Sequence, residues 1–229
     1  MKKSIVAVLA TTTVLSAVHL AKADTIADWT FETSLPSGTG PYSPEVGSGS
    51  ATAVGLGTIS NPAGNGSSHS FSANGWNVGT SYYQFQVSTL GYNNVTLSYD
   101  QTSSNTGPGL FNLEYTTDGV NFFTVSSGYS VLANASPNPV WNGTTSSSLY
   151  SFNYNLSSIA GLNNQSVVDF LIVDASTTSA NGGTVAGTGT DRVDNVIVTG
   201  SLAPVPEPST LALGALGAVA GLLRLRRKA

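Results

Sequence analysis

Four acidic side chains near the two ends of the central region are the strongest candidates for a metal site. Asp28 and Glu32 lie early in the chain, in DWTFE, whereas Asp191 and Asp194 lie late, in DRVDN, where Asn195 adds a neutral oxygen. Oxygen atoms of this kind are the ligands that Ca²⁺ prefers. We therefore predict a structural calcium site where the first and last strands meet. The alternative is that these carboxylates are simply solvated at the strand ends.

Two tryptophans in turn-rich stretches are candidates for carbohydrate binding. Trp76 lies in ANGWNVG and Trp141 lies in PNPVWNG. An aromatic ring beside amide side chains can stack on a sugar ring while its polar neighbours bind the hydroxyl groups. The alternative is that both rings cap the end of the hydrophobic core, because large aromatic side chains are usually mostly buried.

The composition excludes several other kinds of chemistry. The chain has no cysteine, and the region between Asp24 and Glu207 has no lysine and only one histidine, His69. These absences rule out thiol catalysis, disulfides, cysteine-based zinc sites and a Schiff-base lysine. No Gly-x-Ser-x-Gly elbow accompanies His69. Hydrolysis of glycans by two carboxylates stays an alternative, but no pair is marked for it, and we predict that the protein is not an enzyme.

The basic residues are concentrated at the two ends of the chain. Of eight lysines and arginines, only Arg192 lies between Asp24 and Pro208, and this region holds all twelve acidic residues. One positive against twelve negative charges gives this region a net charge of −11, whereas the whole chain carries −4. Such a region repels phosphate backbones, so we expect no nucleic-acid partner. The same field attracts divalent cations.

Alternating apolar residues predict β-strands throughout residues 24–200. The alternation is clear in YYQFQV, NVTLSY, LFNLEY and YSFNYNL, and a period of two is typical of a strand with one buried face. The stretch VVDFLIVD is apolar on both faces, as in a covered strand. Only LSSIAGLNN suggests one or two helical turns. Many short strands separated by polar turns favour an antiparallel β-sandwich.

The connections between these strands also carry information. Asp118-Gly119 predicts a hairpin with a two-residue turn. The strands around Trp29 and Val196 should lie near each other, because domain termini are often adjacent. Residues 33–51 and 175–190 are expected to be long polar loops.

The N-terminus has the features of a secretory signal peptide. Two lysines precede a mostly apolar run over residues 5–20, and Ala21 and Ala23 are small residues at the positions that signal peptidase reads. We therefore predict that residues 1–23 are a signal peptide with a helical apolar part, cleaved before Asp24.

The C-terminus combines a short motif, an apolar run and a basic end. Val205, Pro206, Glu207 and Pro208 precede 13 residues, 211–223, that would make a short hydrophobic helix. A membrane-spanning helix usually needs about 20. The motif, its spacing to the run and the Arg-rich end resemble the PEP-CTERM sorting signal. In that family, found in Gram-negative bacteria that make exopolysaccharide, a membrane protease called exosortase recognises the Pro-Glu-Pro motif.

This resemblance implies the route that the protein takes. It implies export across the inner membrane, transient insertion of a precursor in the membrane, and processing by an exosortase-type membrane protease. Its destination would be the cell surface or an extracellular exopolysaccharide matrix. Residues 201–208 would be the linker that carries the motif, and residues 209–229 the hydrophobic sorting segment with its basic tail.

Residues 24–200 resemble the jelly-roll β-sandwich domains that accompany such tails. The resemblance rests on residues 28–32, 115–122 and 191–196, and related sandwiches include carbohydrate-binding modules. We thus expect an all-β, antiparallel, jelly-roll-like sandwich in a non-catalytic cell-surface or matrix protein. A carbohydrate-binding module is the main alternative, and a carboxylate-based glycan hydrolase is a second.

Overall fold

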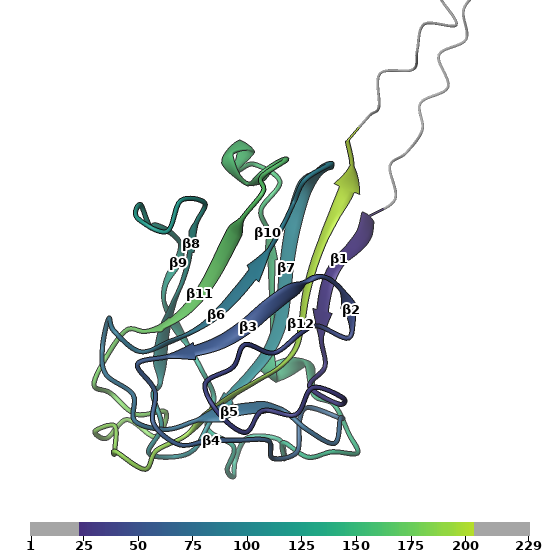
Figure 1. Cartoon of the computed structure of the whole chain (residues 1–229). Helices are drawn as coiled ribbons and strands as arrows, with labels where there is room; N and C mark the ends of the chain where they lie inside the picture. The colour runs from purple at the N-terminus through teal and green to yellow at the C-terminus, as the bar shows by residue number, and fades with distance from the viewer. Residues whose placement is uncertain (1–22, 204–229) are drawn as a thin grey trace, which may run out of the picture.

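Two antiparallel β-sheets face each other in the computed structural model, which describes residues 23–203 (Figure 1). Sheet A has the strand order β10-β7-β12-β1-β2, with β5 beside β12 and β4 beside β5. Sheet B has the order β3-β6-β11-β8-β9. The predicted all-β sandwich is confirmed, whereas both predicted terminal helices lie outside the described residues.

The strands are short except for two in the middle of sheet A. Sheet A contains β1 (Ala23–Trp29), β2 (Val46–Gly47), β4 (Ile59–Ser60), β5 (Phe71–Ala73), β7 (Tyr92–Ser103), β10 (Ser151–Asn155) and β12 (Asp191–Leu202). Sheet B contains β3 (Gly49–Val54), β6 (Tyr82–Val87), β8 (Leu110–Thr116), β9 (Phe123–Ser130) and β11 (Val168–Asp174).

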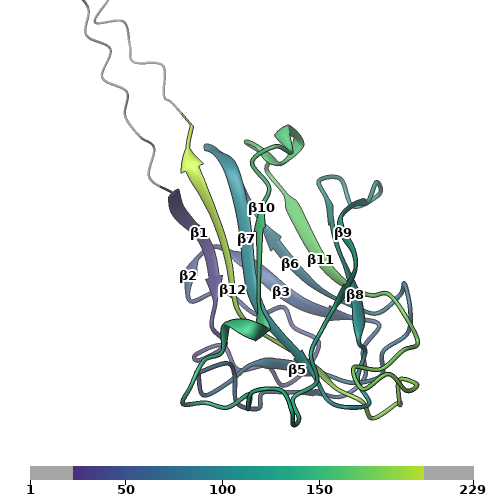
Figure 2. The ribbon, with the colours of Figure 1, turned by 180° about the vertical axis from the view of Figure 1, so that it is seen from behind.

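The first and last strands pair directly. In the β1–β12 ladder Ala23 lies opposite Ser201 and Trp29 opposite Val196, which confirms the expected neighbourhood of these strands. Figure 2 shows β12 between β1 and β7. The described chain therefore begins and ends at the same end of the sandwich.

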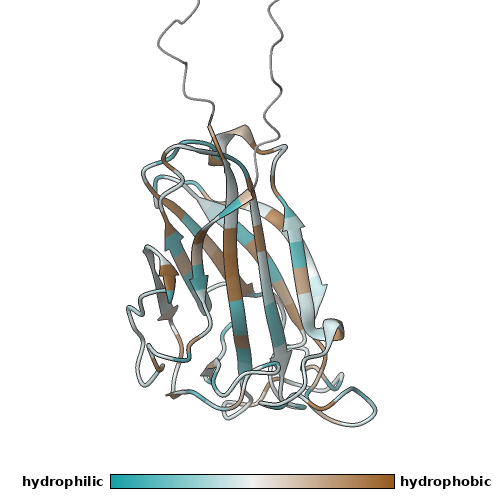
Figure 3. Cartoon of the chain, turned by 90° about the vertical axis from the view of Figure 1, so that its right-hand side faces the viewer, coloured by the Kyte–Doolittle hydropathy of each residue, from teal (hydrophilic) through white to brown (hydrophobic). Residues whose placement is uncertain are grey.

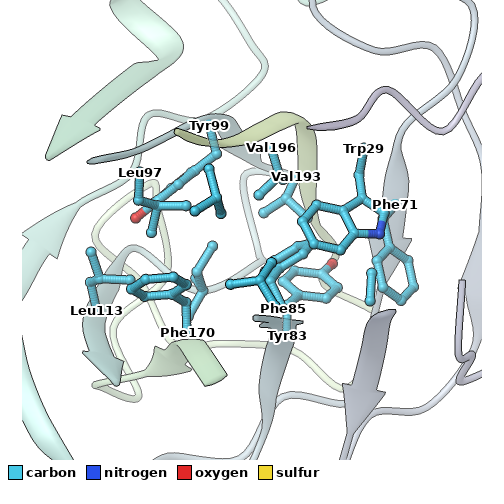
Figure 4. Packing of buried hydrophobic residues seen from close by; sticks show 14 of the residues in the cluster. Trp29, Phe71, Tyr83, Phe85, Leu97, Tyr99, Leu113, Phe170, Val193 and Val196 are labelled. Atoms are coloured by element: carbon cyan, nitrogen blue, oxygen red, sulfur yellow. The ribbon is translucent and has the colours of Figure 1, made fainter. Parts of the chain in front are cut away.

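The core lies between the sheets and consists of aliphatic and aromatic side chains from both (Figure 4). Trp29 meets Phe85 edge to face, with ring centroids 5.4 Å apart, and Phe71 lies 4.9 Å from Tyr83. Figure 3 shows hydrophobic and hydrophilic bands alternating along the strands, as the period of two predicts. Since the chain has no cysteine, this burial takes the place of disulfides in stabilising the domain.

The loop predicted over residues 33–51 is wrong in its second half. This stretch contains β2 and the first residues of β3, which pairs with β6 along its whole length. Its sequence GSATAV has only small apolar side chains, and Ala51 and Ala53 face the core. Small side chains give a weak period-two signal, so the sequence did not reveal this edge strand. By contrast, the predicted helical turn is a 3₁₀ turn, Ala160–Leu162.

The β8–β9 hairpin exists, but its turn has six residues rather than two. Asp118 Oδ1 accepts hydrogen bonds from the backbone N–H groups of Val120 (2.9 Å) and Asn121 (2.8 Å). These N–H groups are thereby withdrawn from the ladder, and the turn becomes a side-chain-capped loop. The same donors hold the pKa of Asp118 well below its ordinary value. Within residues 23–203, no helix has the length and apolar character needed to cross a membrane.

Adjacent positions on β6 should respond oppositely to truncation, because Phe85 is 1% exposed and Gln84 points away from the core. Phe85→Ala should lower the free energy of unfolding by about 3–5 kcal/mol. Gln84→Ala should change it by less than about 0.5 kcal/mol. Urea denaturation of both variants measures the difference, and equal effects would contradict this assignment of the two faces.

Candidate functional site

The outer face of sheet B carries a row of polar side chains along β6. Because Tyr83 and Phe85 point into the core, the alternate residues Tyr82, Gln84 and Gln86 point outward. All three are partly exposed. This face thus offers one phenol and two amide groups spaced along a single strand.

The outward side chains of the neighbouring central strand, β11, form a floor. Asp169, Leu171 and Val173 are only 7%, 3% and 5% exposed, although they lie on the outer face of the sheet. In the ladders, Leu171 lies opposite Gln84 on one side and Glu114 on the other. Longer side chains on both neighbouring strands therefore rise above β11, which leaves a depression along it.

One hollow of about 140 Å³ lies at the β8–β9 end of this depression. The six-residue turn after β8 forms its wall, so the carboxylate-bound loop around Asp118 also shapes this hollow. Phe122 is 49% exposed at this wall and offers an aromatic surface. The lining residues are Tyr82, Gln84, Thr116, Gly119, Phe122, Asp169 and Leu171.

A second hollow of about 180 Å³ lies toward the other end of β6 and β11. Gln86 lines this hollow and Asp169 lines the first, and Gln86 Nε2 donates a hydrogen bond of 2.9 Å to Asp169 Oδ1 between them. The two hollows and this pair are called the trough below. The second hollow is lined by Ser48, Gly49, Gln86, Val87, Ser88, Ser166 and Val167.

The trough combines hydrogen-bonding groups with aromatic faces. Amides donate and accept hydrogen bonds, a carboxylate accepts them, and a phenol does both. Such groups suit a ligand rich in hydroxyl groups, while the rings of Tyr82 and Phe122 suit its apolar surfaces. From Tyr82 to Gln86 the strand advances roughly 13 Å, at about 3.3 Å per residue, so an extended ligand fits better than a single small ring.

The two predicted tryptophans lie elsewhere and are buried. Trp76 is 7% exposed, and its Nε1 donates to the Ala73 carbonyl at 3.0 Å. Trp141 is 4% exposed; its Nε1 donates to the Ala63 carbonyl at 2.7 Å, and its ring meets Tyr150 edge to face. Neither ring has an open face for stacking, which favours the alternative that both belong to the packed interior.

Two of the four predicted calcium ligands do not lie together. Asp28 lies on β1 beside Glu45, and burial and the charge of Glu45 raise the pKa of Asp28. Asp191 is fully buried, with Gln101 Nε2 at 3.1 Å from Oδ1 and Ser103 Oγ at 2.9 Å from Oδ2. Asp28 and Asp191 are therefore held in different polar environments.

Asp191 fits its surroundings best as a neutral acid. Ser103 Oγ lies 2.6 Å from the Pro108 carbonyl as well as 2.9 Å from Asp191 Oδ2. The hydroxyl has one proton and the carbonyl only accepts, so a protonated Asp191 that donates to Ser103 satisfies all three groups. In agreement, burial raises the pKa of Asp191 well above its ordinary value.

The other two predicted ligands, Glu32 and Asp194, flank one turn. Glu32 Oε1 accepts from His69 N at 2.8 Å, and Asp194 Oδ2 accepts from Ser67 Oγ at 2.6 Å and from Asn65 N at 2.8 Å. Burial raises the pKa of Asp194 to about 6. No cluster of three or more Asp, Glu or His side chains suited to a metal ion occurs in residues 23–203. Calcium binding stays a prediction, carried by Glu32 and Asp194.

Asp174 is a further buried acid that sequence reasoning missed. It ends β11 with 1% exposure, and burial raises its pKa to about 6. Its Oδ1 accepts only a long bond of 3.3 Å from Ser176 N. The charge of Asp174 also contributes to the raised pKa of Asp191, which places two acids near each other at this end of the sandwich.

The trough residues were also missed, although the sequence contained a signal for them. In YYQFQV the positions opposite the core are Tyr82, Gln84 and Gln86, and in VDFLIVD the first outward position is Asp169. The alternation indicates which residues point outward. It does not indicate which outer face is hollow, because that depends on strand order and on the turn after β8.

The C-terminal segment matches a known sorting motif. Residues 204–228 match the PEP-CTERM protein-sorting motif. The chain carries a PEP-CTERM sorting signal. This confirms the predicted motif at Val205, Pro206, Glu207 and Pro208, and it implies an exported protein that an exosortase processes. Ala21 and the motif itself lie outside the described residues, and Ala23 is the first residue of β1, so cleavage at the N-terminus stays a prediction.

Solved structures of similar shape include domains named for carbohydrate binding. The CBM22-1 xylan-binding domain of Paenibacillus barcinonensis Xyn10C is 12% identical, with a TM-score of 0.42 and coverage of 81% of this chain and 100% of that chain. The Clostridium thermocellum xylanase 10B CBM22-1–GH10 modules are 14% identical, with a TM-score of 0.41 and coverage of 79% of this chain.

A third similar structure is the family 11 carbohydrate-binding module of Clostridium thermocellum. It is 16% identical, with a TM-score of 0.31 and coverage of 79% of this chain and 100% of that chain. The present chain spans only 29% of the xylanase chain. Values this low do not transfer a ligand to the present chain. No curated protein matches it in sequence.

Added calcium should raise the thermal midpoint of the protein if Glu32 and Asp194 hold the ion. A ligand that binds only the folded state adds about 3 kcal/mol when its concentration is about 100 times its Kd. Asp194→Asn should remove this calcium-dependent shift, whereas Asn153→Ala on the exposed part of β10 should retain it. An unchanged midpoint of the unsubstituted protein would contradict the calcium site.

Stability should fall between about pH 4 and pH 7 because of Asp174. The raised folded-state pKa of about 6, against 3.8 for the unperturbed group, means that the folded protein binds a proton more tightly. The resulting stabilisation is complete below pH 3.8 and is lost as the pH rises through 6; two units correspond to about 3 kcal/mol. Thermal midpoints across this range should vary less in Asp174→Asn, and identical pH profiles would refute the assignment.

Proposed function

We propose that this protein is an exported, non-catalytic polysaccharide-binding protein of the cell surface or the exopolysaccharide matrix. The sorting signal supports its export and its processing by exosortase. The sandwich would then remain outside the cell and hold extracellular glycan chains in the trough of sheet B. Exopolysaccharide is the partner that this destination favours.

The observation that carries this proposal is the trough itself. Its floor includes Asp169 and Leu171, its row of polar groups includes Gln84 and Gln86, and its wall includes the exposed ring of Phe122. Sugars present hydroxyl groups around the ring and apolar C–H surfaces on its faces, so this mixture complements them.

The protein would bind without cleaving its ligand. Glycan hydrolysis needs two carboxyl groups on opposite sides of the scissile bond, about 5–9.5 Å apart. Asp169 and Glu114 share the outer face, which makes a hydrolase the alternative that deserves a direct measurement. In the ladder Asp169 lies opposite Thr116 and Glu114 opposite Leu171, so both carboxyl groups are in the floor and flank of one face. Incubation with the bound polysaccharide should release no reducing ends.

Substitutions in the trough should weaken retention on polysaccharide from the producing cells. Gln84→Ala removes one amide pair of hydrogen-bonding groups and should weaken binding about 5-fold, since one hydrogen bond contributes about 1 kcal/mol. Tyr82→Ala also removes the ring surface and should weaken binding about 10-fold. Affinity electrophoresis of the full-length protein in gels that contain the polysaccharide measures both effects.

Asn153→Ala is the matched control for these variants. Asn153 is an exposed amide on β10 of sheet A, on the other outer face of the sandwich. Its removal should leave retention unchanged. If the control and the trough variants behave alike, or if the unsubstituted protein is not retained, the proposed function is wrong.

A further inference from the structure

The floor of the trough contains a carboxylate with an unused oxygen. Asp169 is 7% exposed, and its Oδ1 is held by Gln86 Nε2 at 2.9 Å. Among the described residues no donor forms a hydrogen bond with Oδ2, and Asp169 lines the first hollow. A carboxylate that is fixed by one oxygen presents the other oxygen as an acceptor in a defined direction.

A second carboxylate flanks the first on the same face. Asp169 lies opposite Thr116 and Glu114 lies opposite Leu171, so Asp169 and Glu114 are diagonal neighbours, at about 7–8 Å between backbones. Both point outward, because the core side of β8 carries Phe111 and Leu113. The face of the trough is therefore negatively charged along β11 and β8.

No basic side chain offsets this charge on sheet B within residues 23–203. The single arginine there, Arg192, lies on β12 of sheet A opposite Ser72 and Thr102. The single histidine there, His69, lies in a loop 3.6 Å from Glu32. Uronate and sulfate groups are usually bound by arginine or lysine, so the described part of this face offers them no partner.

We propose that the trough selects uncharged glycans and that Asp169 is the specificity-determining residue. This inference rests on the proposed function and adds the chemical class of the ligand. Hydroxyl groups of a neutral sugar donate to the free oxygen of Asp169, and hydrogen bonds to a charged acceptor are stronger than those between neutral groups. A sugar that bears a carboxylate or sulfate meets like charges at Asp169 and Glu114, which oppose binding.

The test uses polysaccharide from the producing cells in three forms. These are the neutral fraction, the anionic fraction, and the anionic fraction after its carboxylates have been reduced to alcohols. The full-length protein should be retained by the neutral and the reduced fractions and at least about 100-fold more weakly by the anionic fraction. Retention on neutral glycan should change little with salt, because no ion pair is formed.

Asp169→Asn tests the role of the carboxylate without changing its size. The amide oxygen can still accept from Gln86, so the floor should stay folded, and an unchanged thermal midpoint checks this. We expect binding of the neutral fraction to weaken about 10-fold and the preference for neutral over anionic glycan to decrease. The double variant Asp169→Asn, Glu114→Gln should decrease this preference further, and Asn153→Ala should leave it unchanged.

Each outcome separates this inference from the proposed function. Retention on the anionic fraction at least as strong as on the neutral one would overturn the inference while supporting polysaccharide binding. Displacement of the neutral glycan by chitosan oligosaccharides at low salt alone would also overturn it, since the ligand would then be cationic. An unchanged preference in Asp169→Asn would remove Asp169 from its role. Retention on none of the three forms would overturn the proposed function itself.

Discussion

The antiparallel pairing of β1 with β12 is the contact on which the rest of the sandwich depends. It joins residues about 170 positions apart and places Trp29 opposite Val196, between the two sheets. β12 also pairs with β7 and β5, so the last strand connects three parts of sheet A. Such long-range pairing becomes favourable only after a large loss of chain entropy. The continuous apolar inner face of β12 compensates for that loss.

This pairing also fixes how the domain is attached to its sorting segment. Because Ala23 and Ser201 are partners, the chain enters and leaves the sandwich at one end. The trough runs along β6 and β11 on the outer face of sheet B, away from the β1–β12 ladder, which belongs to sheet A. A tether at the chain ends would therefore leave the face of sheet B free for an extended ligand.

The scarcity of basic residues shapes the interior as well as the trough. Asp191 has no cationic partner and is accommodated by the amide of Gln101, which is itself bonded to Tyr129 and, through it, to Tyr99. A buried acid with such neighbours is less costly protonated than ionised. Chains of neutral hydrogen bonds thus take the place that ion pairs occupy in other domains, and they couple the stability of the sandwich to pH.

The sequence by itself determined the class of the fold, most of the strands and the sorting signal. Period-two patterns in YYQFQV and NVTLSY require one buried face, and Pro206-Glu207-Pro208 with its apolar run is a local motif that needs no tertiary context. The sequence also indicated that Gln84 points outward. It did not reveal β3, because Ala51 and Ala53 are too small to give a strong pattern, nor the six-residue turn, because the carboxylate of Asp118 binds backbone groups that a tight hairpin would use.

Only the tertiary structure decided which side chains meet. Burial of Trp76 and Trp141, the separation of Asp28 from Asp191, and the convergence of Gln86 with Asp169 depend on strand order across residues far apart in the chain. Local patterns specify the face of a strand on which a residue lies, because that follows from backbone geometry. They do not specify the neighbour across the ladder, which follows from the packing of the whole sandwich.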